Sequence, residues 1–363
     1  MSLAGPAPGR PGGAGFSEWS GGGPDEDGPA PGRPGGAGFS ERSGGGLDED
    51  GPAPRLNHHG LLYGSDEEFL AAAVPFCRDG VENGDAVLAV TTPGNIGLLR
   101  DALGGAAGRV EFVVAEQWYD TPGRALAEYF RYVGRHTAEG GLARVLGEPV
   151  WHGRSPLETA EWTRYEAVVN LAFAASPAWI VCPYDTRVTS PGVVADSLRT
   201  HPRLLEGTGE RLSDSYAPPT DESSWGRPVP PPPPGRGRTE AEFEGGLAPL
   251  RAFVGAAGLS LGMSREGAER LVLAANEVAT NAVRHGGGRG RAAVWRDAHQ
   301  VVCDITDPGS GGADEAVWYA GYVAPDPCAP SGHGLWAVRQ LCELVELETG
   351  PRGTTVRLRL ALR

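Results

Sequence analysis

The stretch LVLAANEVATNAVRHG, Leu271 to Gly286, decides how the C-terminal part of this 363-residue chain is interpreted. Its apolar residues recur at the i, i+3, i+4, i+7 spacing of a buried helix face. Glu277 and Asn281 lie four residues apart, so they share a face beside that apolar stripe. A carboxylate and a carboxamide there can hold a water or a metal ion over a shallow pocket. An ordinary solvated face is the alternative, and this stretch alone does not decide between them.

The sequence around this helix predicts an α+β domain over residues 241–363. Ser264 is the expected N-cap of the long helix, which a shorter helix at Leu247–Ala257 precedes. A hairpin follows at Ala293–Trp295 and Val301–Thr306, then a helix from near His333 to Gln340, then two strands around the Gly350–Gly353 turn. This order predicts an antiparallel or mixed sheet with helices on one face.

Two glycine-rich motifs follow the long helix. In Asp307-Pro-Gly309-Ser-Gly311 the glycines permit close approach of a ligand, and Asp307 can accept a hydrogen bond from an exocyclic amine. Ser331-Gly-His-Gly-Leu335 opens a helix whose free backbone N–H groups can bind phosphate. Each motif alone is weak, since an Asx turn or a flexible helix entry would also produce it.

Taken in order, ExxxN on a helix, DxGxG after a strand, GHGL opening a helix and GTTV in a strand resemble the GHKL (Bergerat) ATPase superfamily. NEVATNAVRHG and GHGLWAVRQL resemble the anti-sigma factor serine kinases within it. The resemblance implies ATP and Mg²⁺ as cofactors, Glu277 as general base, Asn281 as Mg²⁺ ligand and Asp307 as reader of the adenine amino group. It also implies a base pocket and a phosphate loop, with these members: Gly309, Gly311 and Thr354, with Thr355 as the alternative, on the adenine side; Gly332, His333, Gly334 and Leu335 around the phosphates.

The chain contains no Lys, so cationic help would come from Arg284 or Arg339. The segment Gly312–Pro330, at the position of the ATP lid, is aromatic and Pro-rich and departs from the family pattern. It could form a docking surface, or it could simply pack on the domain.

Residues 55–216 show strands alternating with helices, which predicts an α/β domain built on a parallel sheet covered on both faces. The expected strands are HHGLLY, Ala86–Thr92, Arg109–Ala115, Leu142–Glu148 and Trp179–Asp185, and the expected helices are Ser65–Arg78, Ile96–Leu103, Pro122–Thr137 and Leu157–Ala175. Ligands of such sheets bind beyond the carboxyl ends of the strands, where Tyr63, Thr91, Glu148 and Cys182 fall.

Each of these residues also has a plain structural interpretation. Glu148 can simply end a strand, and Cys182 is typical of a small core residue. His58 and His59 could be a surface pair, and two histidines without further ligands make a weak metal site.

The segments HHGLLYGSDEEFLAAAVPFCRDGVENGD, RVLGEPVW, RYEAVVNLAF, CPYDT and RTHP together resemble the MEDS sensory domain. That family is related to RecA-like folds without a working phosphate loop. The resemblance implies a sensory or docking role and carries no known chemistry.

The remaining segments are predicted to be non-globular. A tandem repeat, GPAPGRPGGAGFSE, fills much of residues 1–54 and indicates a disordered Gly/Pro-rich tail. Residues 217–240 read as a Pro-rich linker, in which Pro230–Pro234 predict a polyproline II spacer.

Composition excludes several functions. Without Lys there is no complete Walker A loop and no Schiff base. A net charge of −14 argues against direct nucleic-acid binding. Five scattered cysteines and the absence of a long apolar run predict a soluble, reduced, cytoplasmic protein without a membrane span.

We therefore expect an anti-sigma regulatory factor with ATP-dependent serine/threonine kinase activity toward an anti-sigma factor antagonist. The N-terminal domain would modulate it, the partners would be a sigma factor and that antagonist, and the family suggests a homodimer. A nonenzymatic, ATP-gated partner-binding regulator is the alternative. A sensor histidine kinase is disfavoured because residues 240–270 contain no His.

Overall fold

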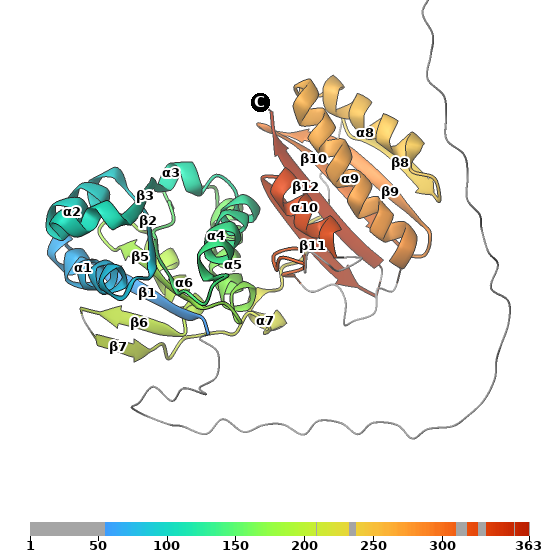
Figure 1. Ribbon diagram of the computed structural model, residues 1–363. Coiled ribbons are helices and arrows are strands. Elements are labelled where there is room, and N and C mark those ends of the chain that lie inside the picture. The colour runs from blue at the N-terminus through green and yellow to red at the C-terminus, as the bar shows by residue number, and fades with distance from the viewer. Residues whose placement is uncertain are drawn as a thin grey trace, which may run out of the picture. The chain divides into compact units, whose positions relative to one another are not determined.

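A computed structural model describes residues 55–207, 209–231, 237–309, 318–325, 332–351 and 353–362 (Figure 1). The tail expected over residues 1–54 lies outside these ranges, as do part of the Pro230–Pro234 spacer and Gly311. Within the described residues, no helix has both the length and the apolar character needed to cross a bilayer.

The N-terminal sheet has seven strands in the order β3-β2-β4-β5-β1-β6-β7. Their bounds are β1 Asn57–Tyr63, β2 Ala86–Thr91, β3 Val110–Val114, β4 Ala143–Gly147, β5 Ala178–Asp185, β6 Arg203–Glu206 and β7 Gly209–Leu212. Strands β1 to β6 pair in parallel, as expected, but β7 pairs antiparallel with β6. Strands β6 and β7 were not expected from the sequence, because both have only four residues and every residue of β7 is exposed.

Helices cover both faces of this sheet, as the alternating pattern predicted. They are α1 Asp66–Asn83, α2 Pro93–Leu103, η1 Gly104–Arg109, α3 Ala115–Trp118, α4 Pro122–Thr137, α5 Pro156–Ala172, α6 Pro191–Thr200 and the short α7 Glu222–Trp225. Phe69 and Leu99 belong to the core under α1 and α2, whereas Leu126 and Trp162 belong to the core under α4 and α5.

Several of these helices start with the same local signal. Ser or Thr caps the first turn and Pro takes the next position in α2, α4, α5 and α6. Proline suits this position because its missing N–H would have no partner there and its φ is already helical. Helix α2 therefore begins three residues earlier than expected, at Pro93 instead of Ile96, and α5 one residue earlier, at Pro156 instead of Leu157.

The C-terminal sheet has five antiparallel strands in the order β11-β12-β10-β9-β8. They are β8 Thr239–Glu244, β9 Arg289–Asp297, β10 Gln300–Asp307, β11 Leu344–Gly350 and β12 Gly353–Ala361. Helices α8 Ala248–Ser260, α9 Arg265–His285 and α10 His333–Leu341 share one core with this sheet. The predicted α+β architecture is confirmed, with one strand, β8, that starts within the segment expected to be linker.

The sheet face opposite that core carries buried ion pairs. Arg357 lies across from Asp304 in the β10–β12 register and binds both of its carboxylate oxygens, at 2.7 and 2.8 Å. Both side chains are almost fully buried, at 2% and 4% exposure. A bidentate pair of this kind fixes strand register as well as charge.

We expect Asp304→Ala to destabilise the chain by about 3–5 kcal/mol, because it leaves the Arg357 charge buried without a partner. The joint replacement Asp304→Leu with Arg357→Met should recover most of that loss. Urea unfolding of the full chain measures both.

The control is Asp297→Ala, which removes a half-exposed partner of Arg359 and should cost no more than about 1 kcal/mol. Equal losses for Asp304→Ala and Asp297→Ala would contradict the assignment of special weight to the buried pair.

Candidate nucleotide site

Helix α9 carries the residues from which the site is built. The Ser264 side chain accepts a hydrogen bond from the Gly267 N–H at 3.1 Å, which confirms the expected N-cap. A continuous buried stripe fixes the rotation of the helix, with these members: Ala268, Leu271, Ala274, Ala275, Val278, Ala279 and Ala282. Glu277 and Asn281 flank this stripe and are half-buried, so their polar ends are neither solvated freely nor lost in the core.

Asp307 ends β10 and is 8% exposed. The Gly309 N–H donates to its Oδ1 at 3.0 Å, and the Thr354 backbone also donates to the carboxylate. Burial nevertheless raises the pKa of Asp307, which shows that the carboxylate has given up more hydration than these bonds replace.

The end of α9 lies directly against this carboxylate. A Cβ at Gly286 would stand 2.3 Å from Asp307 Cγ, and one at Gly309 would stand 2.5 Å from the Gly286 Cα. At Gly353, where φ is +112°, a Cβ would meet the Asp307 carbonyl oxygen at 1.8 Å. Three chain segments therefore meet at Asp307 only because each contributes a glycine. From the sequence, Gly353 was expected only to belong to a turn, and Gly286 only to follow the long helix.

Thr354 sits opposite Asp307 in the β10–β12 register, as expected for a residue on the same side of the pocket. Its hydroxyl lies 3.3 Å from that of Thr349. Thr355 pairs with Thr306 one step away, so its side chain points to the other face of the sheet. Of the two threonines considered, Thr354 is the one that shares a face with Asp307.

The N-terminus of α10 provides the second end of the site. Gly332 is its N-cap with φ at +97°, and as a glycine it has no side chain with which to cap the first turn. Gly332 and His333 are exposed, whereas Leu335 packs on the domain core. A Cβ at Gly334 would lie 3.1 Å from Glu277 Oε2, so this turn comes close to the Glu277 carboxylate. Uncapped N–H groups at a helix start favour an anion.

These contacts order the site along α9. Gly334 lies beside Glu277 and Asp307 lies beside Gly286, with Asn281 between them. At ~1.5 Å per residue, Glu277 and Gly286 are about 13 Å apart along the helix axis. The structure thus brings together Glu277, Asp307, Gly309, Gly334 and Thr354, while Gly311 lies outside the described residues.

The two arginines considered as cationic helpers differ. Arg339 is buried and donates to the carbonyl oxygens of Trp318, Ala320 and Val345, so its charge is committed to the fold. Arg284 is exposed on the last turn of α9. Within the described part of the lid, Trp318 and Tyr322 are buried, which favours a packed segment over an open docking surface.

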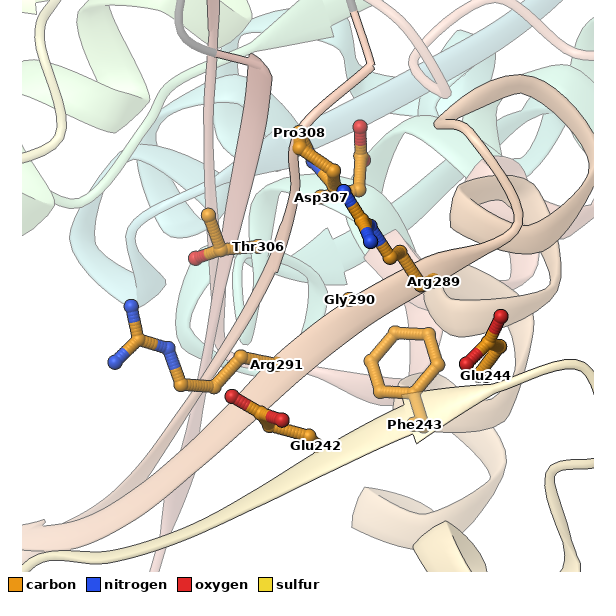
Figure 2. Close-up of a pocket in the computed structure, with 9 residues that line it drawn as sticks. All are labelled: Glu242, Phe243, Glu244, Arg289, Gly290, Arg291, Thr306, Asp307 and Pro308. Atoms are coloured by element: carbon orange, nitrogen blue, oxygen red, sulfur yellow. The ribbon is translucent and has the colours of Figure 1, made fainter.

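A separate hollow of about 640 Å³ reaches Asp307 from the β8 and β9 side (Figure 2). Phe243, Arg289 and Arg291 line it, and Figure 2 shows Arg289 beside Asp307 and Pro308. The hollow contains neither Glu277 nor Asn281. We place the candidate site along α9 instead, because Glu277 lies there beside the first turn of α10 and Asn281 lies between Glu277 and the end of the helix at Asp307.

The carboxyl end of the N-terminal sheet also brings expected residues together, but in a closed arrangement. Glu148 accepts from the Tyr63 hydroxyl at 2.7 Å, from Asn95 Nδ2 at 2.9 Å and from the Thr91 hydroxyl. These side chains are all buried. A carboxylate with this many donors is satisfied, so the structural interpretation of Glu148 holds.

The expectation of a surface pair at His58 and His59 is wrong. Both side chains are buried, at 2% and 1% exposure. His59 is paired on both ring nitrogens, with Trp179 at 3.0 Å and Glu210 at 2.6 Å. His58 points to the opposite face of the sheet, toward Cys182.

Comparison with known proteins matches each half of the chain to a family. Residues 57–202 match the MEDS family, described as the methanogen/methylotroph DcmR sensory domain. Residues 221–360 match the family described as the histidine kinase-like ATPase domain.

Among solved structures, the RsbU and RsbW domains of Rv1364c from Mycobacterium tuberculosis are similar at 18% identity, with a TM-score of 0.25. That match covers 34% of this chain and 32% of the other, so this chain spans about a third of that protein's length. No functionally curated protein matches the chain.

The parallel α/β architecture at the N-terminus and the antiparallel sheet under helices at the C-terminus agree with these two families. The chain therefore joins a MEDS sensory domain, residues 57–202, to a histidine kinase-like ATPase domain, residues 221–360.

Proposed function

We propose that this protein is an ATP-dependent serine/threonine protein kinase that acts on an anti-sigma factor antagonist and also binds a sigma factor. The MEDS domain modulates this activity. The observation that carries the proposal is the order of groups along α9: Glu277 beside the first turn of α10, Asn281 in the middle, and the buried Asp307 at the far end.

The chain's own residues fit a magnesium-bound nucleotide. Gly286 and Gly309 pack their backbone beside Asp307 without placing a side chain over its carboxylate, which leaves that carboxylate as an acceptor for a base. Asn281 offers an oxygen ligand of the kind Mg²⁺ prefers. The first turn of α10, whose N-cap is the glycine Gly332, offers backbone N–H groups to phosphate. When bound, Mg²⁺ offsets the phosphate charge that builds up during transfer.

Each residue has a separate task in this proposal. Asp307 accepts a hydrogen bond from the adenine amino group and so sets base identity. Asn281 holds the metal side of the phosphates, and the α10 N-terminus orients them. Glu277 aligns the acceptor hydroxyl and takes its proton. With Arg339 committed to the fold, the helix N-terminus provides the positive potential within the described part of the site.

The match to the histidine kinase-like ATPase domain does not by itself indicate phosphorylation on histidine. Such an enzyme needs an acceptor His on a helix that precedes the ATPase domain, and residues 240–270 contain none. A nonenzymatic, nucleotide-gated regulator would use the same pocket without transfer. The half-buried Glu277 beside Gly334 favours transfer, because nucleotide binding alone has no use for a second carboxylate near the phosphates.

Glu277→Gln should lower phosphoryl transfer at least about 100-fold while changing the ATP dissociation constant less than about threefold, because the general base acts only on the acceptor hydroxyl. The measurement uses the full chain, labelled ATP, Mg²⁺ and a panel of candidate antagonist proteins. Transfer to Ser or Thr is read by phosphopeptide mapping, and ATP binding by calorimetry.

The matched control is Glu269→Gln, since Glu269 is an exposed carboxylate on the same helix. Partner binding without any transfer by the wild-type chain would leave the nonenzymatic regulator as the function. Label on His would instead establish a histidine kinase.

Asp307→Asn should weaken ATP binding by roughly 10- to 100-fold, the loss expected for a hydrogen bond to a charged group. Inosine triphosphate lacks the exocyclic amine, so the wild-type chain should prefer ATP over it and the variant should not. If the variant keeps the full preference for ATP, Asp307 does not read the base.

ATP binding should also depend on pH through Asp307. The ionised carboxylate is a stronger acceptor for the amine than the protonated carboxyl, and burial raises the pKa of Asp307. Affinity should therefore be complete at high pH and fall on acidification, starting above the range of an ordinary aspartate, about 3.9. Fluorescent-nucleotide titrations across pH should show this fall in the wild type and lose it in Asp307→Asn.

A further inference from the structure

Four buried side chains of the MEDS domain converge on one point away from the nucleotide site. His58 lies on β1, Cys182 on β5, Glu166 on α5, and His201 directly follows α6. One ligand-type atom from each lies within 4.8 Å of those of the other three. The side chains are 0–4% exposed, so bulk water does not explain how their polar atoms are satisfied.

Hydrogen bonds on the outer side of both histidines fix their orientation. Asn170 gives its Nδ2 protons to the carbonyl oxygens of Ala167 and Thr200, so its Oδ1 is free to accept from His58 Nδ1 at 3.0 Å. His201 Nδ1 donates to the Ser197 carbonyl oxygen at 2.8 Å. Both rings therefore carry their proton on Nδ1 and direct the Nε2 lone pair inward. Metal-binding histidines are held in the same way.

The inward atoms are short of donors. Glu166 Oε2 and His201 Nε2 stand 3.6 Å apart and neither has a hydrogen-bond partner. That separation is too long for a hydrogen bond between a protonated carboxyl and a ring nitrogen. The Cys182 thiol lies 3.5 Å from His58 Nε2 and also hydrogen-bonds with Glu166, so one weak proton is shared among all the acceptors around it. Buried acceptors without donors are costly, so the cluster as it stands is incomplete.

The spacing suits a tetrahedral cation. Zinc bonds of ~2.0 Å to N and O and ~2.3 Å to S place neighbouring ligand atoms about 3.3–3.6 Å apart. The measured separations from His58 Nε2 to Cys182 Sγ and from His201 Nε2 to Glu166 Oε2 are 3.5 and 3.6 Å, and His58 Nε2 to Glu166 Oε2 is 4.0 Å. A thiolate and a carboxylate would also balance the two positive charges, leaving no net charge in the buried site.

We propose that His58, Glu166, Cys182 and His201 form a binding site for a divalent transition metal ion of the zinc class. Two imidazoles, a thiolate and a carboxylate fill a four-coordinate shell, which is typical of a structural rather than a catalytic site. The ion joins β1, β5, α5 and the end of α6 at the centre of the MEDS domain.

The effect of burial on the pKa values of the ligands agrees with this proposal, which rests on the geometry. Burial raises the pKa of Glu166 to about 8 and lowers the pKa of His201 to about 4, so without an ion the carboxyl keeps its proton and the imidazole stays neutral near pH 7. Neutral imidazole is the metal-binding form. Ionised Glu166 and Cys182, by contrast, need the compensating charge of a cation at this depth.

The test refolds the purified full chain in chelated buffer, with or without Zn²⁺ or Co²⁺, and then removes free metal by gel filtration. We expect about one equivalent of metal per chain by elemental analysis and a higher unfolding midpoint in the loaded protein. The cobalt form should show a thiolate-to-metal charge-transfer band.

Three variants locate the site. Glu166→Gln is nearly isosteric and removes one anionic ligand, and Cys182→Ser removes the thiolate. Both should retain less than about a tenth of the wild-type metal, and Cys182→Ser should lose the charge-transfer band. The control Cys77→Ser alters another buried thiol of the same domain, outside the cluster, and should keep both.

Either of two results would overturn the proposal. The first is a folded wild-type chain that retains no Zn²⁺ or Co²⁺, which would leave a proton or a buried water to fill the cluster. The second is metal content that Glu166→Gln and Cys182→Ser leave unchanged, which would place the ion elsewhere. Because the wild-type spectrum reports the thiolate directly, the test remains decisive even if a variant does not fold.

Discussion

The C-terminal site depends on one close approach, that of the end of α9 to the Asp307 carboxylate. Gly286 and Gly309 permit it, and a Cβ at either position would stand within 3.0 Å of Asp307 or of the backbone opposite. The contact fixes where β10 ends relative to α9, and hence how far Asn281 and Glu277 lie from Asp307 along a rigid helix. The first turn of α10 comes close to Glu277 because Gly334 has no Cβ.

The sequence was informative about this domain because its signals are local. The apolar stripe of α9, the Ser264 cap and the β9–β10 hairpin could all be predicted from spacing within about twenty residues, and the ordered motifs placed Asp307 and Gly334 on the correct elements. The contact between Gly286 and Asp307 could not be predicted, since neither segment has a local pattern that indicates the other as its neighbour. Strand β8 was missed for a related reason: TEAEFE alternates, but at the edge of the sheet it buries only Phe243.

The N-terminal domain shows more clearly which contacts could not be predicted from the sequence. Five of the seven strands described for it and its four longest helices were predicted. The four residues of the buried cluster, however, come from positions 58, 166, 182 and 201. No spacing rule links residues so far apart, and only the β1–β5 pairing, with Gly60 opposite Cys182, brings the two strands into register. His58 and His59 looked like a pair because they are adjacent. Adjacent side chains in a strand point to opposite faces, so His58 and His59 have different partners on the two sides of the sheet.

Two buried glutamates of the MEDS domain, Glu148 and Glu166, differ in the hydrogen-bond donors around them. This difference supports a metal ion at Glu166 and not at Glu148. Glu148 receives protons from Tyr63, Thr91 and Asn95, so its environment is complete without any ion. Glu166 is equally buried, but two imidazole lone pairs face it and burial raises its pKa to about 8. A core that only needed a polar residue at this position would have supplied donors, as it does for Glu148. Acceptors gathered around one point are instead what a cation requires.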